Sequence, residues 1–292
     1  MMKSSIGWDK IRFLVTNACN YKCPFCHNEG QTKYASPKLM SFNQLKRFID
    51  IIKEQNVSEI CFSGGEPFLN DDIVKMIVYA NNETTCDIGC ASNISLISES
   101  QIKDLSTTRV KFNIQFPYAN DYGFKKSTVN GNYSSILKKI DLIRSVGIEI
   151  GLNSVVQNTS KKEIEEVIQF AIKQEIPLKL LPQIGLKGSE NYKNFIYPIL
   201  QKYAIDYKDK GSGATRWTLK SKGYQTVVLY IDSPCFYRDI NVCRQYGEIR
   251  ILPNMSAQTC ILRNEAVSLS LNEGKDVVLG QLRELWKNFS HC

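Results

Sequence analysis

Short apolar runs alternate with longer stretches of helical periodicity through the first 185 residues of the chain. Six of the runs have the length of β-strands, and they are residues 11–16, 59–62, 87–91, 110–116, 149–156 and 178–182. Several are apolar at successive positions rather than at every second one. That pattern is typical of parallel strands buried on both faces.

Segments with helical periodicity lie between these runs. Ser41 and Gln44 have the spacing of a capping box at the start of one helix, and Ser160 and Glu163 have it at the start of another. Residues 132–146 form a third helix pattern. Strand–helix units in series predict an α/β fold with a parallel sheet, arranged as a partial (β/α)6 TIM-like barrel. Such folds place their chemistry at the carboxyl ends of the strands.

The pattern changes after residue 185. Residues 190–207 predict a helix that Pro198 bends or splits. Residues 214–219 and 225–231 predict a β-hairpin, because a polar turn ending in glycine separates two runs rich in strand-forming residues. Residues 277–289 predict a last amphipathic helix.

This change divides the chain into two expected domains. Residues 1–185 would form the partial barrel, and residues 186–292 a small α+β extension that binds an auxiliary cluster. A chain of 292 residues is long enough for one large domain or two small ones. Its 43% hydrophobic and 23% charged residues exclude disorder and coiled coil as overall classes.

Cysteine usage and charge narrow the function classes. The first residues lack an apolar run of signal-peptide length and no stretch reaches membrane-spanning length, so we expect a cytoplasmic protein without a membrane partner. In a reducing compartment its 10 cysteines favour metal ligands, reactive groups or buried packing over disulfides. The net charge of +8 is spread along the chain, so a nucleic-acid partner is not expected.

Three of the cysteines lie close together after the first strand. Cys19, Cys23 and Cys26 have the spacing C-x3-C-x2-C, which lets one loop aim three sulfurs at one cluster. Three ligands on a [4Fe–4S] cube leave one iron open for a small ligand. A zinc site with His27 as fourth ligand is the alternative, and chance spacing is another.

A second motif follows the strand at residues 59–62. Gly64 and Gly65 would let backbone approach a ligand closely, and Glu66 beside them could accept hydrogen bonds from an ammonium group. Pro67 completes the motif. An ordinary turn between a strand and a helix is the other interpretation of these residues.

Together the two motifs resemble the radical S-adenosylmethionine (SAM) superfamily, whose hallmarks are this cysteine spacing, an aromatic residue at the position of Phe25, and a Gly-Gly-Glu-Pro turn. The resemblance implies an oxygen-sensitive enzyme in which Cys19, Cys23 and Cys26 hold a [4Fe–4S] cluster. SAM would bind the open iron, with its ammonium group held by the turn and by Glu66. An electron from a donor such as flavodoxin or ferredoxin would release a 5′-deoxyadenosyl radical, which abstracts hydrogen from a substrate.

The same resemblance assigns cofactor-binding roles to further strand-end residues. Ser92 and Asn93 stand where the superfamily has a ligand-binding Thr-Asn pair. Gln115 replaces its usual serine on the fourth strand, and Asn153 matches an asparagine on the fifth. Each is also compatible with a plain polar residue at the end of a strand.

The entry strand and later stretches resemble the molybdenum-cofactor GTP 3′,8-cyclase (MoaA-like) branch. That branch carries a second [4Fe–4S] cluster on a C-x2-C-x13-C motif in its C-terminal extension. Cys243 and Cys260 fit its outer pair, but Tyr246 occupies the middle position. Cys235 is the expected substitute ligand, and Cys292 is a second candidate. Three thiols in a β-rich cap, free or bound to zinc, are the alternative.

The basic residues with which that branch binds GTP are only partly kept. Arg12 and Arg250 remain and are candidate substrate ligands. The other basic positions fall on four residues that carry no positive charge, namely Glu59, Cys61, Gly151 and Glu248. Carboxylates at these positions would repel a triphosphate, so we expect a small-molecule substrate other than GTP. Alternatives are a peptide-modifying maturase, although few residues precede the first strand, a GTP 3′,8-cyclase, and a non-catalytic metal-binding module.

Overall fold

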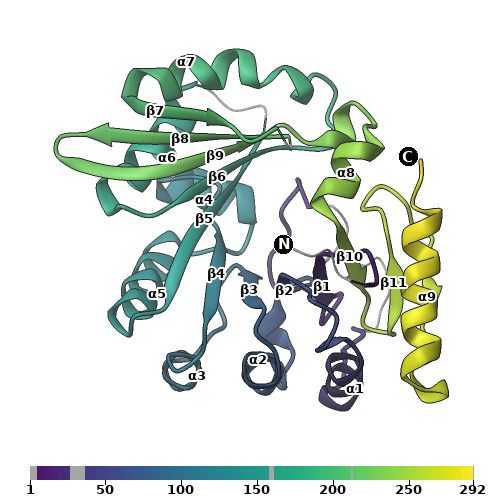
Figure 1. The fold of residues 1–292 in the computed structure, drawn as a ribbon. Coiled ribbons are helices and arrows are strands. Elements are labelled where there is room, and N and C mark those ends of the chain that lie inside the picture. Colours follow the sequence, from purple (N-terminus) through teal and green to yellow (C-terminus); the bar gives the residue numbers. More distant parts are fainter. Residues whose placement is uncertain (1–4, 27–36, 158–160, 212, 292) are drawn as a thin grey trace.

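The computed structural model describes residues 5–26, 37–157, 161–211 and 213–291 (Figure 1). Its centre is a run of parallel strands in sequence order that curves into an open arc. The strands are β1 (Lys10–Leu14), β2 (Glu59–Ser63), β3 (Asp87–Ser92), β4 (Val110–Gln115), β5 (Glu149–Val156) and β6 (Leu178–Pro182). They confirm the six strands predicted from the sequence, with ends that differ by no more than two residues.

Helices cover the outer, convex side of this arc (Figure 1). They are α1 (Phe42–Ile52), α2 (Ile73–Glu83), α3 (Glu99–Leu105), α5 (Tyr133–Ser145) and α6 (Lys161–Gln174). Helix α4 (Asp121–Thr128) lies instead near the loop after β1, where the Lys22 amide donates to the Thr128 carbonyl at 3.1 Å. The capping box at the start of α1 is confirmed, because the Ser41 side chain accepts from the Gln44 backbone and the Gln44 side chain bonds back to Ser41. Ser160 lies outside the described residues.

The remaining segments extend the same sheet at both edges. They are α7 (Lys193–Tyr203), β7 (Ala204–Asp209), β8 (Ala214–Ser221), β9 (Tyr224–Ile231), α8 (Ile240–Tyr246), β10 (Glu248–Ile251), β11 (Ser256–Gln258), β12 (Val267–Ser268) and α9 (Lys275–Asn288). The strand order is β12-β11-β10-β1-β2-β3-β4-β5-β6-β9-β8-β7, and the sheet does not close. A domain boundary after residue 185 stays a prediction, because the segments on both sides of it share one sheet.

The helix predicted over residues 190–207 is wrong in its extent. Helix α7 ends at Tyr203, and the next six residues form β7, which pairs antiparallel with β8. Tyr207 of this strand packs its ring on Trp217 at 4.4 Å. Pro198 lies inside α7 without splitting it, since the buried side chains of Ile196 and Leu200 hold the helix on the core.

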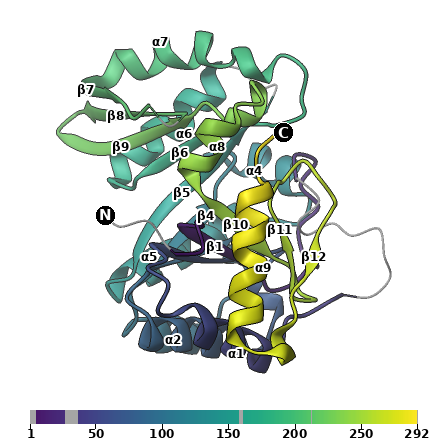
Figure 2. The same cartoon turned by 45° about the vertical axis from the view of Figure 1, so that its right-hand side comes forward.

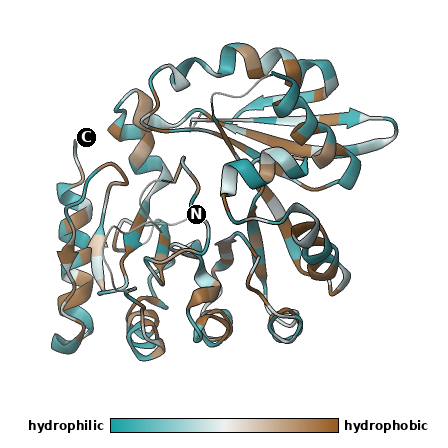
Figure 3. Cartoon of the chain, turned by 180° about the vertical axis from the view of Figure 1, so that it is seen from behind, coloured by the Kyte–Doolittle hydropathy of each residue, from teal (hydrophilic) through white to brown (hydrophobic). Residues whose placement is uncertain are grey.

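The two faces of the barrel strands differ in chemistry. On β1, Ile11 and Phe13 are fully buried in the core beneath the helices, whereas Lys10 and Arg12 point to the inner, concave side. Neighbouring strands repeat this division, because residues paired in register share a face. The outer helices likewise carry alternating hydrophobic and hydrophilic stretches (Figure 3). The barrel lumen is therefore lined mainly by polar side chains.

The last helix is tied to the segment before β1. Trp8 is buried, donates from its indole nitrogen to the Leu282 carbonyl at 2.9 Å, and meets Trp286 edge-on with ring centroids 4.9 Å apart. Helix α9 lies along the side of the molecule next to α1 and β11 (Figure 2). It thus covers the edge where β10 joins β1.

Candidate active site at the carboxyl ends of the strands

The loop after β1 carries three thiols. Cys23 is buried, whereas Cys19 and Cys26 are partly exposed. The Cys26 amide donates to the Cys23 carbonyl at 3.1 Å, which turns the loop tightly between these two ligand positions. Tyr21, Cys23 and Phe25 form a small apolar cluster apart from the main core. Phe25 therefore anchors the loop by burial, and its role in cofactor binding stays a prediction.

Burial keeps the thiols protonated while no cation is bound. It raises the pKa of Cys19 to about 12 and that of Cys23 to about 11. A metal ligates the thiolate, so loading this loop must release protons and replace them with positive charge.

The glycine turn is joined directly to the cysteine loop. Gly65 donates its amide to the Thr16 carbonyl at 2.9 Å, and Glu66 donates to the Ala18 carbonyl at 2.8 Å. A methyl group on Gly65 would lie only 1.8 Å from the Ala18 oxygen, so glycine is required for this close approach. Gly64 has φ +139°, a region that other residues rarely adopt.

Glu66 fixes the turn from inside the protein. Its fully buried carboxylate accepts from the Ser92 hydroxyl at 2.6 Å, from the Asn93 amide at 2.7 Å and from the Phe68 amide at 3.2 Å. Burial raises the pKa of Glu66 to about 7 in spite of these donors. Ser92 and Asn93 thus hold the glutamate, and a direct bond from Glu66 to an ammonium group stays a prediction.

Asn93 continues the network to the cysteine loop. Its side-chain amide donates to the Asn20 oxygen at 2.9 Å and lies 3.9 Å from the Cys19 sulfur. The turn after β2, the end of β3 and the loop after β1 are therefore one hydrogen-bonded unit.

Two amide side chains on β4 and β5 complete the site. Gln115 donates to the Cys23 sulfur at 3.1 Å. Asn153 pairs with Gln115 in register, and its Oδ1 is buried without a hydrogen-bond partner among the described residues. An orphaned acceptor beside a three-thiol loop fits a site that receives a donor group from a ligand, because buried acceptors are normally satisfied.

The C-terminal thiols lie apart from this loop in sequence and are partly exposed. Cys235 is in a short 3-10 turn, Cys243 is in α8, and Cys260 follows β11. Among the residues that the structure describes, no three metal-ligating side chains already converge on one point, so loading would have to draw either thiol set together. His27 and Cys292 lie outside the described residues.

Arg12 and Arg250 both face the lumen, where Glu248 joins them. Glu248 accepts two hydrogen bonds from Arg12, at 2.9 and 2.8 Å, and lies 3.8 Å from the Arg250 Nε. Burial alone would raise the pKa of Glu248, but the arginines lower it to about 2. Arg12 also donates to the Cys61 sulfur at 3.2 Å. The Glu248 carboxylate thus accepts the pair of N–H groups with which Arg12 could otherwise bind a phosphate.

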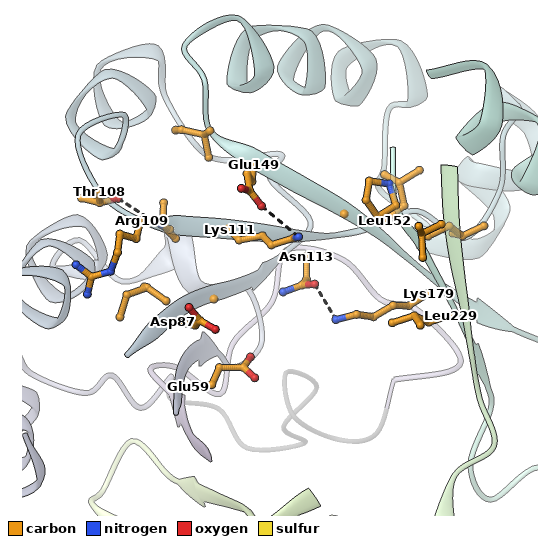
Figure 4. A pocket seen from close by; sticks show the side chains of 18 of the residues that line it. Glu59, Asp87, Thr108, Arg109, Lys111, Asn113, Glu149, Leu152, Lys179 and Leu229 are labelled. Carbon is orange, nitrogen blue, oxygen red and sulfur yellow. Dashed lines mark hydrogen bonds and ion pairs between the residues drawn. The ribbon is translucent and has the colours of Figure 1, made fainter. Parts of the chain in front are cut away.

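Two polar residues on the other side of the lumen, Lys179 and Asn113, were not predicted from the sequence. Lys179 of β6 and Asn113 of β4 line a cavity in the lumen (Figure 4). The signal in the sequence is a single lysine in the otherwise apolar run 178–182, which places it on the face opposite the core.

The fold and the joined motifs define a class of enzyme, and a comparison of sequences identifies it. A sequence model of the Radical SAM superfamily matches residues 13–171, from β1 to α6. The chain belongs to this superfamily. Its cofactors are a [4Fe–4S] cluster and SAM, and its reaction requires an electron donor and a substrate.

Particular relatives resemble nearly the whole chain. A "Probable GTP 3′,8-cyclase" of Methanococcus maripaludis is 26% identical over 275 residues, which is 91% of both chains. A "GTP 3′,8-cyclase" of Clostridium perfringens is 22% identical over 292 residues, covering 96% of this chain and 88% of the relative. These names match the branch that the sequence motifs indicated.

Solved structures confirm the fold. Streptococcus suis SuiB bound to SAM superposes with a TM-score of 0.71 at 15% identity, over 94% of this chain and 67% of SuiB. Native anSMEcpe with bound SAM gives 0.68 at 13% identity, over 95% of this chain and 82% of that one. The partial barrel is therefore confirmed, with an open sheet. No helix in the described ranges is both long and apolar enough to cross a membrane.

Proposed function

We propose that this enzyme holds its cluster on Cys19, Cys23 and Cys26, binds SAM against residues 64–67, and acts on a small molecule other than GTP in the barrel lumen. When bound, the cluster and SAM would together supply one-electron radical chemistry for removing a hydrogen atom from the substrate. The observation that carries the proposal is the single hydrogen-bonded unit that unites the three-thiol loop with the glycine turn.

The chain's own residues have separable roles in this proposal. The thiols supply the ligands, and Gln115 donates to one of them. The glycine turn brings backbone next to the loop, and Glu66 holds that turn in place from below. Asn153 offers the unpaired acceptor for a donor group of SAM.

The rejection of GTP is supported by the charges of the lumen. Glu248 is ion-paired with Arg12, and Glu59 is ion-paired with Lys10 at 3.1 Å. Two carboxylates thus accompany the cations on this wall, and a triphosphate would meet their negative charge at short range. GTP cyclisation remains the alternative, supported by the names and full-length likeness of the relatives. The location in the cytoplasm stays a prediction.

A second cluster on Cys235, Cys243 and Cys260 belongs to the same proposal. All three cysteines are partly exposed. Cys235 precedes α8 and Cys243 lies within it, and this helix leads into β10 beside the lumen. Peptide modification and a flavodoxin or ferredoxin as electron donor stay predictions. A purely metal-binding module is not favoured, because the chain belongs to an enzyme superfamily.

The decisive experiment measures 5′-deoxyadenosine from anaerobically reconstituted protein with SAM and dithionite. We expect slow formation by the wild type and none by Cys19→Ala. Cys86→Ala is the control, because that buried thiol bonds to the Val57 carbonyl away from the loop. Continued product from Cys19→Ala would refute the ligand assignment. Addition of GTP should neither accelerate the reaction nor be consumed, and conversion of GTP would establish the alternative.

A further inference from the structure

A cavity of about 790 Å³ runs into the lumen from the amino ends of β3 to β6. Residues of β8 and β9 form its far wall, and Figure 4 shows Lys179 reaching into it toward Asn113. Its size is that of a pocket for a small organic molecule. It opens at the end of the barrel opposite the three-thiol loop.

The inner end of this cavity approaches the site proposed for SAM. Asn113 lines the cavity, and Gln115, two residues further along the same face of β4, contacts the Cys23 sulfur. Two residues of a strand span about 7 Å. A molecule held in the cavity can therefore present a C–H bond close to the cysteine loop.

Lys179 and Arg216 lie on one wall of the cavity and form no ion pair with a carboxylate among the described residues, and Lys210 also lines the cavity. Lys179 and Arg216 both pair in register with Leu229, so they flank it on the same face of the sheet. Lys179 donates to the Asn113 oxygen at 3.0 Å, and Arg216 lies 3.5 Å from the Thr218 hydroxyl. Partly buried cations of this kind favour binding an anion.

The facing wall is acidic. Asp87 and Glu59 are neighbours in register and line the cavity across from Lys179 (Figure 4). Glu59 is paired with Lys10, whereas no cation of the described residues forms an ion pair with Asp87. The cavity therefore has a positive side and a negative side.

We propose that this cavity binds a small zwitterionic substrate, with a carboxylate or phosphate group between Lys179 and Arg216 and an amino group facing Asp87. This inference rests on the proposed function and names its substrate class. A single oxyanion can bind between Lys179 and Arg216, whereas the additional charges of a polyphosphate would extend toward the carboxylates of the acidic wall and be repelled.

Saturation-transfer NMR on the cluster-loaded protein tests this assignment with four simple probes. They are 5-aminopentanoate, phosphoethanolamine, pentanoate and tripolyphosphate. We expect one of the two zwitterions to bind most tightly, and its identity distinguishes a carboxylate from a phosphate ligand. Lys179→Met and Arg216→Met should each weaken that binding about tenfold, the size of one charge-assisted hydrogen bond.

Two further variants make the test specific. Lys208→Met is the matched control, because Lys208 pairs with Arg216 in register but does not line the cavity, and it should bind as the wild type does. Asp87→Asn should weaken binding of the zwitterion but not of pentanoate. The proposal is overturned if neither zwitterion binds, if tripolyphosphate binds best, or if Lys179→Met and Arg216→Met bind normally.

Failure of this inference is separable from failure of the proposed function. Formation of 5′-deoxyadenosine by the wild type without any substrate reports on the cysteine loop and the turn alone. If that product forms while the probes fail, the cavity assignment is wrong and the enzyme class stands.

Discussion

At the scale of single residues, the site depends on buried charged side chains that are hydrogen-bonded by neighbouring residues of the protein. Glu66 is enclosed by three donors from β3 and the turn, yet burial still raises its pKa to about 7. Its ordinary pKa of 4.5 applies in the unfolded chain. The folded protein therefore binds the proton more tightly than the unfolded chain does, and its stability must fall as the pH rises through this interval.

We expect the free energy of unfolding of the cluster-free protein to decrease by roughly 3 kcal/mol between pH 4.5 and 7 through Glu66 alone. The contribution should level off about one pH unit above the folded pKa, where Glu66 is ionised in both states. Glu66→Gln does not titrate, so urea unfolding across this range should show a flatter dependence in the variant. Parallel curves for the two proteins would show that Glu66 is not the group responsible.

Glu248 determines what the two lumen arginines can bind. In Glu248→Gln the carboxylate charge is lost, and Arg12 and Arg250 can turn to a phosphate. We expect the affinity for GTP, measured by equilibrium dialysis, to rise about tenfold or more, because a charge-assisted bond replaces a repulsion. Glu149→Gln is the control, since Glu149 is exposed and pairs with Lys111. Equal GTP affinity in all three proteins would remove Glu248 as a specificity determinant.

The residue-scale site was predictable where it is local in sequence. The cysteine spacing and the glycine turn are short motifs, so both could be recognised without coordinates, and the structure joins them by hydrogen bonds. Their roles as cluster and SAM ligands stay predictions. Lys179 and Asn113 meet across strands far apart in the chain, and only register brings them together. The pairing of Arg12 with Glu248 has the same origin, since β10 joins β1 from the other end of the chain.

At the scale of elements, short apolar runs predicted the barrel strands, although the expected burial on both faces is not uniform. On β4, buried Val110, Phe112 and Ile114 alternate with partly exposed residues. The hydrophobic pattern failed over residues 204–207, where the helical pattern continues although the backbone pairs with β8. Local periodicity cannot reveal a partner strand that follows in the sequence. The hairpin was predictable, since Lys222 and Gly223 supply the positive φ angles, +49° and +89°, of a tight turn.

The turn after β2 is the element most sensitive to a single methyl group. Gly65→Ala places a carbon 1.8 Å from the Ala18 oxygen, so the turn and the cysteine loop must separate. We expect a loss of about 2–3 kcal/mol in unfolding free energy together with loss of SAM cleavage. Gly280→Ala on the exposed side of α9 has nothing within 4 Å and should gain about 0.5–1 kcal/mol. An unchanged Gly65→Ala protein would contradict the described contact.

At the scale of the whole molecule, the loop that bears the three N-terminal thiols and the segments that bear Cys235, Cys243 and Cys260 all connect strands of one sheet. The residues after β6 add strands to both edges of the barrel sheet. The C-terminal segment is therefore part of the same sheet and not a separate one. The sequence could predict its hairpin and last helix, but not this insertion at two edges, because strand pairing over such distances leaves no local pattern.

Iron analysis of the reconstituted chain tests the second cluster. We expect about eight irons per chain from two four-iron clusters, and about four in Cys243→Ala. Cys90→Ala, which removes a fully buried core thiol, should retain about eight. About four irons in the wild type would leave Cys235, Cys243 and Cys260 as structural or zinc-binding residues.

The position of β1 has a consequence for how the chain is made. This strand lies between β2 and β10, so one of its neighbours is the next strand of the chain and the other is synthesised only after all the other barrel strands. During translation the strand keeps one open edge, and long-range pairing of this kind is slow to form. The three-thiol loop that follows β1 therefore stays incompletely framed until β10 has been made. Iron–sulfur assembly on this loop would then act on a chain in which β10 is already present.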